Sequence, residues 1–229
     1  YKDEYDREVL EHNEGDIYKY FKVEGYNFDA YMAVIYKPEN IHVVHTKYLG
    51  YDGEYLVDMA KREGGIVAIN GGGFIDLDGE GNGGEPAGIV IEDGKIIQGG
   101  SNGSGVIGLT YDNKLYLGYI SANEAINMGI RDAIEFGPFL IVNGKKADIR
   151  GNGGYGIHPR SAIGQRKDGI VLFLVIDGRR VDSVGASIRD VMDIMDKYGA
   201  YNAANLDGGN SSALVENYQI FCYNVNSKK

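Results

Sequence analysis

The sequence predicts an α+β fold: a mixed, largely antiparallel sheet with about three helices in a single domain. Short apolar and β-branched runs recur along the 229 residues, separated by turn-forming pairs such as Asp-Gly and Asp-Asn. Glycine is abundant, with 35 residues and no fixed period, which indicates many tight turns. About three segments combine the 3.6-residue apolar period with capping residues, so helices are expected to be few.

No linker-like run divides the chain, and its length suits one large domain. Residues 1–25 are charged, rich in tyrosine and only weakly periodic, so we expect an irregular lead-in there. The single domain is expected to occupy residues 26–229.

The first regular elements are predicted at residues 28–36 and 41–46, two strand-like runs that form a hairpin. His42 and His45 lie in the second run. They fall on opposite faces of a strand, which makes them a poor pair of metal ligands. We interpret them as ordinary strand residues.

Three helices are predicted from periodicity and caps. The first covers residues 55–62 and is stopped by the glycines that follow. The second begins at Ser121, with Glu124 completing a capping box. The third begins at Ser187, with Asp190 in the equivalent position, and has a broad apolar face.

The other apolar runs predict strands, most of them in hairpins with Asp-Gly or Asp-Asn turns. In residues 133–142 a Gly-Pro pair interrupts the run, which predicts a bulge or a sheet edge. The strand–helix–strand passages 44–69 and 170–206 are expected to add parallel pairing. The remaining predicted strands are residues 66–69, 87–91, 95–98, 106–110, 114–119, 162–164, 170–176, 202–205 and 213–215.

Composition excludes several classes of protein. The net charge of −10 and the pI of about 4.9 argue against non-specific binding to nucleic acid or to an anionic membrane surface. The single cysteine, Cys222, excludes an internal disulfide framework and a cysteine-built zinc site, and its neighbours predict a buried structural thiol. No run has the length and apolarity of a spanning helix or the pattern of a signal peptide.

One stretch, residues 205–212, stands out for its chemistry. It contains one carboxylate, Asp207, with two glycines, two amides and two hydroxyls. Apolar residues flank it, so we expect a strand to enter a tight turn and a second strand to leave it. Glycine allows positive φ and a close approach of the backbone to a ligand. A lone Asp-Gly pair is usually just a turn, but this stretch is longer than a turn needs.

Three further polar stretches also end apolar strands. If the four meet on one rim, they bring together two carboxylates, two arginines, a histidine, amides and hydroxyls. Arginine beside exposed backbone N–H groups suits a phosphate or carboxylate, and paired carboxylates suit acid–base or glycoside chemistry. The candidate residues are Asn70, Gly71, Gly72, Gly73, Phe74, His158, Arg160, Ser161, Asp177, Arg179, Asn205, Asp207, Gly208, Gly209, Ser211 and Ser212.

Simpler roles for some of these residues stay open. Asp177 is equally well explained as a turn residue. Arg160 would fit a structural ion pair, and His158 would fit a polar rim position without a chemical role. The chain has no Gly-x-Ser-x-Gly elbow, no Walker A motif and no dinucleotide-binding fingerprint, which argues against a serine hydrolase and against these nucleotide sites.

Residues 76–85 form an acidic, glycine-rich loop whose carboxylates would suit a hard cation such as calcium. The spacing does not match an EF-hand loop, so a solvated mobile loop or a lid is the favoured interpretation. We therefore expect no required cofactor. The weak metal candidates are Asp76, Asp78, Glu80 and Glu85.

Several motifs together resemble the phosphodiester glycosidase family. They are residues 68–74, 136–138, 158–164, 168–169, 175–179 and 205–212. The resemblance runs from about Tyr55 to Val215, in the order of the family's motifs. The family usually has a second phenylalanine after Gly-Gly-Phe and a third glycine before Ser-Ser. Here Ile75 and Asn210 stand at those positions, which leaves the sugar preference open.

The resemblance implies hydrolysis of a sugar-1-phosphodiester between the anomeric carbon and the phosphate oxygen. It also implies a carbohydrate phosphodiester as substrate, no nucleic-acid partner, and an extracytoplasmic location in a glycopolymer context, secreted or anchored at a bacterial cell surface. Asp207 is then the expected base or nucleophile, with Asp177 second. His158 would donate a proton or bind the phosphate, Arg160 and Arg179 would bind the phosphate, and the other candidates would orient the substrate.

Two other functions fit the same residues. A non-catalytic domain that binds glycans or cell-wall polymer would use the same rim, and the 18 tyrosines would offer stacking surfaces for sugars. A metal-dependent phosphodiesterase would use the carboxylates of the acidic loop, and a chelator would abolish its activity.

Overall fold

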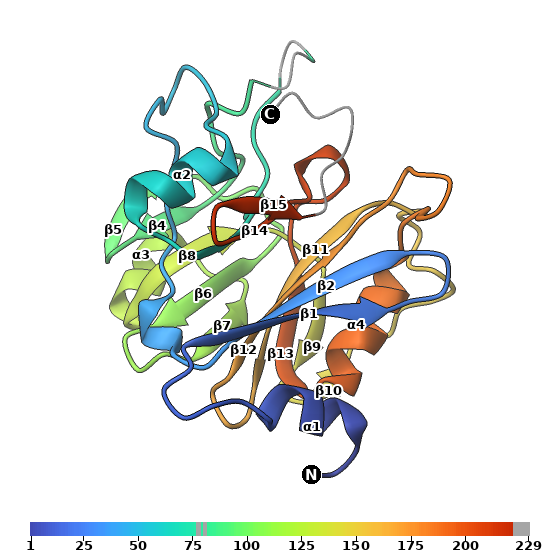
Figure 1. Cartoon of the computed structure of the whole chain (residues 1–229). Coiled ribbons are helices and arrows are strands. Elements are labelled where there is room, and N and C mark those ends of the chain that lie inside the picture. The colour runs from blue at the N-terminus through green and yellow to red at the C-terminus, as the bar shows by residue number, and fades with distance from the viewer. Residues whose placement is uncertain (77–78, 80–81, 222–229) are drawn as a thin grey trace.

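The structure, a computed structural model, describes residues 1–76, Gly79 and residues 82–221 (Figure 1). Its largest sheet has seven strands, in the order β1 (Tyr18–Glu24), β2 (Asp29–Ile35), β12 (Val171–Ile176), β11 (Arg160–Arg166), β13 (Ala200–Asn205), β9 (Phe139–Val142) and β10 (Lys145–Lys146). A five-stranded sheet has the order β5 (Lys95–Gln98), β4 (Val90–Glu92), β8 (Ile130–Glu135), β6 (Val106–Thr110) and β7 (Leu115–Gly118). A three-stranded sheet has the order β15 (Gln219–Phe221), β14 (Leu214–Glu216) and β3 (Val67–Ile69).

The described residues also form four α-helices and two short 3-10 turns. The α+β class is therefore confirmed. The helix missing from the predicted set is the first one. The helices are α1 (Glu4–Leu10), α2 (Leu56–Glu63), α3 (Ala122–Asn127) and α4 (Ile188–Lys197), and the 3-10 turns are η1 (Pro38–Asn40) and η2 (Gly209–Ser211).

Every strand pairing in the described part of the chain is antiparallel, so the predicted parallel pairing is wrong. The passage from β12 through α4 to β13 explains the error. These two strands run in the same direction, but β11 lies between them and pairs with both. The crossover therefore skips one strand instead of making a parallel pair.

The expected irregular lead-in over residues 1–25 is also wrong. Helix α1 is capped by the side chain of Asp3 and buries Val9, and β1 pairs with the whole of β2. Strand β1 could not be predicted from the sequence, because Tyr18 to Phe21 are all half-buried, whichever face of the strand they lie on. That pattern gives little contrast in polarity.

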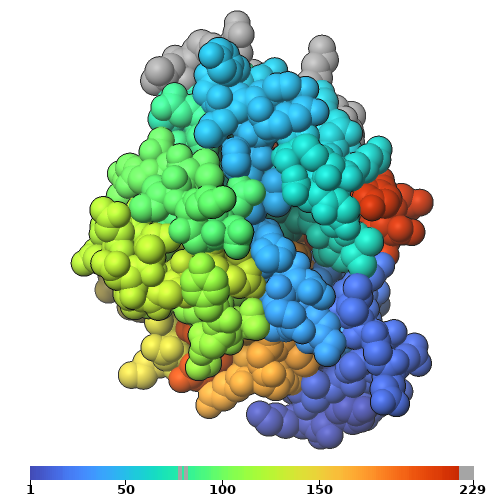
Figure 2. All heavy atoms as spheres, turned by 90° about the vertical axis from the view of Figure 1, so that its left-hand side faces the viewer, coloured from blue at the N-terminus to red at the C-terminus, as the bar shows by residue number. Residues whose placement is uncertain are grey.

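The predicted hairpin between residues 28–36 and 41–46 does not form, because β1 takes the place beside β2. Residues 41–46 instead run without regular structure along the five-stranded sheet, where the backbone N–H of Val43 donates to Asp132 Oδ1 at 3.1 Å. Figure 2 shows this light-blue segment between the green five-stranded sheet and the dark-blue N-terminal region. His45 is accordingly not a strand residue, and its Nδ1 pairs with the carboxylate of Glu92.

Two capping boxes and the glycine stop of α2 are as predicted. Asp52, a further predicted cap, does not cap α2, whose N-cap is Tyr55 without a side-chain cap hydrogen bond. Ser121 with Glu124 and Ser187 with Asp190 both form complete capping boxes. Gly64 ends α2 in the left-handed conformation, with φ of 68°. These signals succeed because each depends on a few neighbouring residues.

The hairpins β4–β5 and β6–β7 form as predicted. The predicted bulge lies just after Gly137-Pro138, where Ala204 is opposite Phe139 and Ala203 is opposite Ile141, so the register shifts by one residue. At Gly137-Pro138 itself the chain changes sheets. It leaves the five-stranded sheet after β8 and enters the seven-stranded sheet as β9. The proline needs no ladder donor there, and its carbonyl accepts the backbone N–H of Asn205 at 3.0 Å.

The seven-stranded sheet is covered on both faces. Helix α4 packs on one face against buried residues such as Leu140 and Leu174, and α1 adds Val9 to the same cluster. The other face packs against the two smaller sheets. This double cover explains why β12 is apolar and buried throughout. Among the residues described, no helix has the length and apolarity needed to cross a bilayer, and Cys222 lies outside them.

Candidate active site

The central strands of the large sheet bring three of the four polar stretches together. Strand β11 begins at Arg160, opposite Ile176 at the end of β12, and Ala162 lies opposite Asn205 at the end of β13. Because β11 is antiparallel to both neighbours, its beginning lies at the same end of the sheet as their ends. We call this the site end.

The fourth stretch arrives from the three-stranded sheet through Asn70. The side-chain Nδ2 of Asn70 donates to the carbonyl oxygen of Asp207 at 2.7 Å. Its Oδ1 accepts the hydroxyl of Ser161 at 2.6 Å and the backbone N–H of Ala213 at 3.1 Å. Asn70 and Ser161 are thus hydrogen-bonded within the protein, and their expected contact with substrate stays a prediction. Asn70 fixes the Asp207 turn against β11 and β14.

The glycine run Gly71–Gly73 is packed closely against the end of β8. The carbonyl of Gly71 accepts the backbone N–H of Asp207 at 3.0 Å. A Cβ on Gly72 would lie 3.2 Å from the carbonyl oxygen of Glu135, and one on Gly73 would lie 3.3 Å from the ring of Phe136. These glycines therefore let two sheets approach. Phe74, also a candidate, forms an isolated bridge with Pro86 at the edge of this run.

Asp207 lies partly buried in the turn after β13. Burial raises the pKa of its carboxyl group, while hydrogen bonds from Ser211 and from the backbone N–H of Gly208, at 2.9 Å, act in the opposite direction. No arginine, lysine or histidine lies within ion-pair distance of Asp207 in the part of the chain that the structure describes. A carboxylate held in this way is a better proton acceptor than an exposed one.

Arg160 is the second central group, and only 6% of its surface is exposed. Its guanidinium donates only to backbone carbonyls, from Nε to Ala186 at 3.0 Å and from Nη2 to Tyr155 at 3.2 Å and Gly156 at 2.9 Å. Burial lowers the pKa of this group. The structural ion pair that the sequence left open is absent among the described residues. A buried cation without a counter-anion favours binding of an anionic ligand.

Two further basic groups lie beside Arg160. Burial lowers the pKa of His158, and the positive charges of Arg160 and then Arg179 lower it further. Arg179 is exposed, has φ of 59°, and donates from Nη1 to the side-chain oxygen of Asn210. A neutral imidazole between two guanidinium groups suits hydrogen bonding to a phosphate oxygen.

Asp177 differs from Asp207 because its carboxylate is fully used. Oδ2 accepts Arg180 Nη1 at 2.7 Å, and Oδ1 accepts the backbone N–H of Gly178 at 2.8 Å. The side chain is buried, and Arg180 also binds Asp182. This is the arrangement of a carboxylate that fixes a turn.

The remaining candidates surround the Asp207 turn. A Cβ on Gly208 would lie 3.0 Å from the carbonyl oxygen of Pro159, and Gly209 has φ of 62°. Both positions therefore favour glycine. Ser212 Oγ and Asn205 Oδ1 are buried, and neither has a hydrogen-bond partner among the described protein atoms. Such atoms at a site are available to a bound ligand or to water.

The sequence reasoning missed Glu135 at the end of β8. Burial alone would raise its pKa, but hydrogen bonds from Ser101 and from three backbone N–H groups outweigh burial and hold the pKa below its usual value. The Ser101 hydroxyl donates at 2.6 Å and the backbone N–H of Gly103 at 2.9 Å. Glu135 therefore anchors the loop that follows β5. In the sequence, only its position directly before Phe136-Gly137 could have indicated that Glu135 lies near the site.

No group of three or more histidine, cysteine, aspartate or glutamate side chains gathers as a metal site within residues 1–76, 79 and 82–221. Asp78 and Glu80 of the acidic loop lie outside these residues, so the calcium expectation stays a prediction. Asp76 and Glu85 are described. The carbonyl of Glu85 accepts the backbone N–H of Ile75 at 2.8 Å, which closes the base of the loop.

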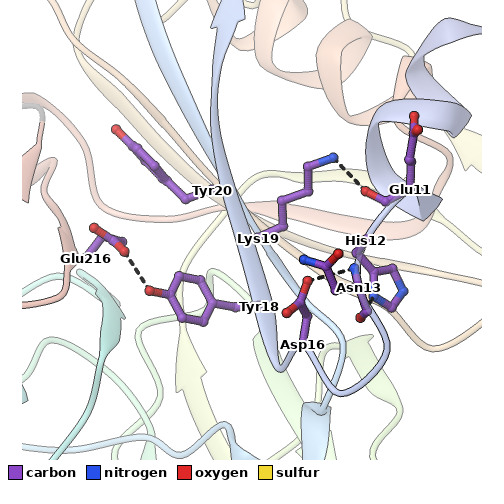
Figure 3. Close-up of a pocket in the computed structure, with 8 residues that line it drawn as sticks. All are labelled: Glu11, His12, Asn13, Asp16, Tyr18, Lys19, Tyr20 and Glu216. Carbon is purple, nitrogen blue, oxygen red and sulfur yellow. Dashed lines mark hydrogen bonds between the residues drawn. The ribbon is translucent and has the colours of Figure 1, made fainter.

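A cavity of about 660 Å³ lies away from the site end (Figure 3). It adjoins the start of β1, where Tyr18 lies opposite Ile35, and Tyr18 donates to Glu216 at 2.6 Å. The amine of Lys19 is occupied by two carbonyls of α1 and the loop after it. Three carboxylates lie in its wall, so it would repel a phosphodiester. Its lining is Glu11, His12, Asn13, Asp16, Tyr18, Lys19, Tyr20 and Glu216.

Two curated relatives share the sequence pattern. An uncharacterized SPbeta prophage-derived protein of Bacillus subtilis, YomE, is 31% identical over 175 residues, which are 69% of this chain and 25% of the relative. The N-acetylglucosamine-1-phosphodiester alpha-N-acetylglucosaminidase of Bos taurus is 25% identical over 185 residues, which are 73% of this chain and 34% of the relative. The chain thus spans about a third or less of the length of these relatives.

Among solved structures, the zebrafish N-acetylglucosamine-1-phosphodiester alpha-N-acetylglucosaminidase catalytic domain, auto-inhibited by its pro-peptide, has the same fold. Its TM-score is 0.74 at 21% identity, covering 95% of this chain and 80% of that one. The sequence profile of the phosphodiester glycosidases matches residues 63–229, well over half of the chain. The chain therefore belongs to the phosphodiester glycosidase family.

Proposed function

We propose that this protein hydrolyses the glycosidic bond of a sugar-1-phosphodiester at the site end. One observation carries the proposal: the buried Arg160 has no carboxylate partner among the described residues, and its side chain packs on Gly208, the residue that follows the partly buried Asp207. Arg160, a cation without a counter-anion, is complementary to the anionic phosphodiester. Asp207, a carboxylate without a cation, is complementary to the electron-poor anomeric carbon. Membership of the family supports a glycosidase-type hydrolase.

The phosphate is assigned to the basic groups. Arg160 would bind one non-bridging oxygen from the wall of the site, and Arg179 and His158 would bind from the rim. Arg179 is steered by Asn210, which holds its guanidinium beside Gly209. Charge-assisted hydrogen bonds of this kind position the diester and stabilise the charge on the departing phosphate.

The chemical step then needs little acid assistance. The bond between the anomeric carbon and the phosphate oxygen breaks, and the departing phosphate monoester is a good leaving group because its second pKa is about 6. Asp207 acts either as the base that takes a proton from the attacking water or as the nucleophile that first bonds to the anomeric carbon. Its raised pKa strengthens it for the first role.

The test is release of the phosphate monoester from a panel of UDP-sugars and simple sugar-1-phosphodiesters. Wild type would be compared with Asp207→Asn and Arg160→Gln, and with Asp112→Asn as a control in an exposed turn. Turnover that both site variants lose and the control keeps supports the proposal. Turnover that Asp207→Asn retains in full would remove Asp207 from the mechanism.

A folded wild type without turnover on the panel would contradict the hydrolase for these substrates. Direct measurement of glycan or cell-wall polymer binding would then decide for the non-catalytic alternative. The extracytoplasmic, glycopolymer setting is part of the same proposal and comes from the family resemblance. Fractionation of producing cells with the activity assay would test it.

A further inference from the structure

Three loops at the site end expose large apolar side chains. We call them the rim loops: residues 25–28 between β1 and β2, residues 149–160 before and into β11, and residues 178–189 between β12 and the first turn of α4. Val181 is fully exposed at 104%, at the tip of its loop. The others are Tyr26 at 88%, Tyr155 at 59%, Val184 at 47% and Ile157 at 44%.

The rim loops are tied into one surface. The backbone N–H of Val184 donates to the carbonyl of Asn27 at 3.0 Å, and the backbone N–H of Asp29 donates to the hydroxyl of Ser183 at 2.9 Å. His158 and Ala186 exchange two backbone hydrogen bonds, at 3.2 and 2.9 Å. Figure 1 shows the blue β1–β2 turn and the orange loop after β12 close together at the right-hand end of the large sheet.

Charge is distributed unevenly on this surface. The two longer rim loops contain five arginines and one aspartate, in a chain whose net charge is −10. Arg160 is buried and Arg180 pairs with Asp177 and Asp182, so three of the five arginines contribute to the charge of the surface. Arg189 donates to the carbonyls of Ile149 and Gly151. Arg150, Arg179 and Arg189 have no ion pair with any carboxylate that the structure describes. Because the Debye length is about 8 Å at physiological salt, the negative charge elsewhere on the molecule is largely screened from the loop tips.

We propose that the rim loops dock on an anionic lipid bilayer, with the apolar tips entering the headgroup boundary and Arg150 and Arg189 binding lipid phosphates. The shape of the surface favours lipid over a protein partner. A side chain that is fully exposed, such as Val181, projects from the surface and has no pocket around it, and a fluid interface accommodates such projections. Arginine beside apolar tips matches the polarity gradient of an anionic interface.

Docking in this way would point the site end at the membrane. A phosphodiester whose alcohol part is embedded in lipid would then reach Arg160 and Asp207 directly. This consequence rests on the proposed function, whereas the docking itself does not and is tested without turnover.

The absence of tryptophan from the chain allows a clean optical test. Val181→Trp places a single tryptophan at the tip, and Ile96→Trp places one on β5, a similarly apolar but remote exposed site at 40% exposure. Vesicles of phosphatidylcholine mixed with phosphatidylglycerol should shift the emission of the first to the blue and leave the second unchanged. A shift at neither position, or an equal shift at both, overturns the proposal.

Sedimentation with the same vesicles gives the second measurement on the full chain. The double variant Ile157→Ser, Val181→Ser should bind about tenfold more weakly than wild type, because two apolar side chains are removed from the interface. Ile96→Ser should bind like wild type. Arg150→Ser should lose binding to phosphatidylglycerol vesicles. Wild type that stays in solution, or a double variant that binds as wild type does, contradicts the docking, even if the loops capture another protein.

Discussion

Asp207 and Arg160 are ionisable groups that are at least partly buried, and neither forms an ion pair among the described residues. Burial raises the pKa of Asp207 without a cation beside it and lowers the pKa of Arg160 without an anion beside it. Both departures disfavour the charged form. The phosphodiester would stabilise the charged form of Arg160, and the positive charge that develops on the sugar in the transition state would stabilise the charged form of Asp207. We infer that substrate binding relieves a cost that folding imposes at this point, as is common where ionisable groups serve a reaction.

Asp207→Asn is expected to lower turnover by roughly 10²- to 10⁴-fold, the usual contribution of a positioned base. The same change is expected to raise thermal stability at pH 7. Folding raises the pKa of Asp207 above its ordinary value of 3.8, so its stabilising effect is full below that pH and is lost as pH rises through the folded-state pKa. The uncharged asparagine avoids this loss.

Melting temperatures of wild type and Asp207→Asn between about pH 4 and about pH 7 would check the sign of this effect. The advantage of the variant should shrink toward the acidic end. An advantage that grows on acidification would mean that the carboxylate is stabilised by folding.

Arg160→Gln is expected to abolish the stabilisation of the protein by inorganic phosphate. A ligand that binds only the folded state raises the melting temperature with its concentration. Arg7→Gln is the control, because Arg7 is an exposed arginine on α1, outside the site end and the rim loops. Thermal denaturation in a phosphate series measures both. Equal phosphate responses in the two variants would remove Arg160 from anion binding.

At the scale of elements, the site depends on a junction between two sheets. Asn70 follows β3 of the three-stranded sheet, and its amide holds the turn after β13 and the hydroxyl of Ser161 on β11. The glycines beside it allow the end of β8 to approach. The junction thus fixes the carboxylate of Asp207 relative to β11 without touching it.

Asn70→Ala is expected to cost about 1–3 kcal/mol of unfolding free energy, because it leaves buried backbone and hydroxyl groups without their partners. Turnover should fall through kcat, since the variant misplaces Asp207 and leaves Arg160 in position. Urea denaturation and steady-state kinetics measure the two effects. Asn152→Ala, which removes only a local bond to Gly154 in an exposed loop, is the control. A change confined to KM would argue that Asn70 contacts the substrate instead.

At the scale of the whole molecule, the N-terminal segment is part of the core. Val9 is completely buried, the hydroxyl of Tyr36 donates to its carbonyl at 2.7 Å, and Tyr198 donates to Glu8 at 2.7 Å. These contacts join α1 to β2 and to the end of α4. The segment therefore stabilises the face of the sheet opposite the two smaller sheets.

Val9→Ala is expected to destabilise the protein by about 2 kcal/mol, from two buried carbon groups at about 0.8 kcal/mol each plus a cavity term. Glu14→Ala, on the exposed loop that follows α1, should have little effect. Chemical denaturation of both variants gives the comparison. A neutral Val9→Ala would show that α1 is not required for the stability of the sheet.

Features that depend on neighbouring residues could be predicted without the structure. The capping boxes at Ser121 and Ser187, the stop at Gly64 and the hairpin turns follow from a few adjacent side chains, whose backbone preferences are local. The motif order was enough to indicate the family, and the polar stretches at strand ends identified Asp207 and Arg160 as candidates.

Which of those candidates form hydrogen bonds or ion pairs within the protein could be read only from the three-dimensional structure. Asp177 and Asp207 look alike as Asp-Gly pairs, yet Arg180 turns back to bind one of them and leaves the other without a cation among the described residues. Strand β1 likewise could be recognised as a strand only from its pairing with β2. Strand pairing and burial depend on contacts between residues far apart in the chain. A local sequence pattern does not show which of these residues meet.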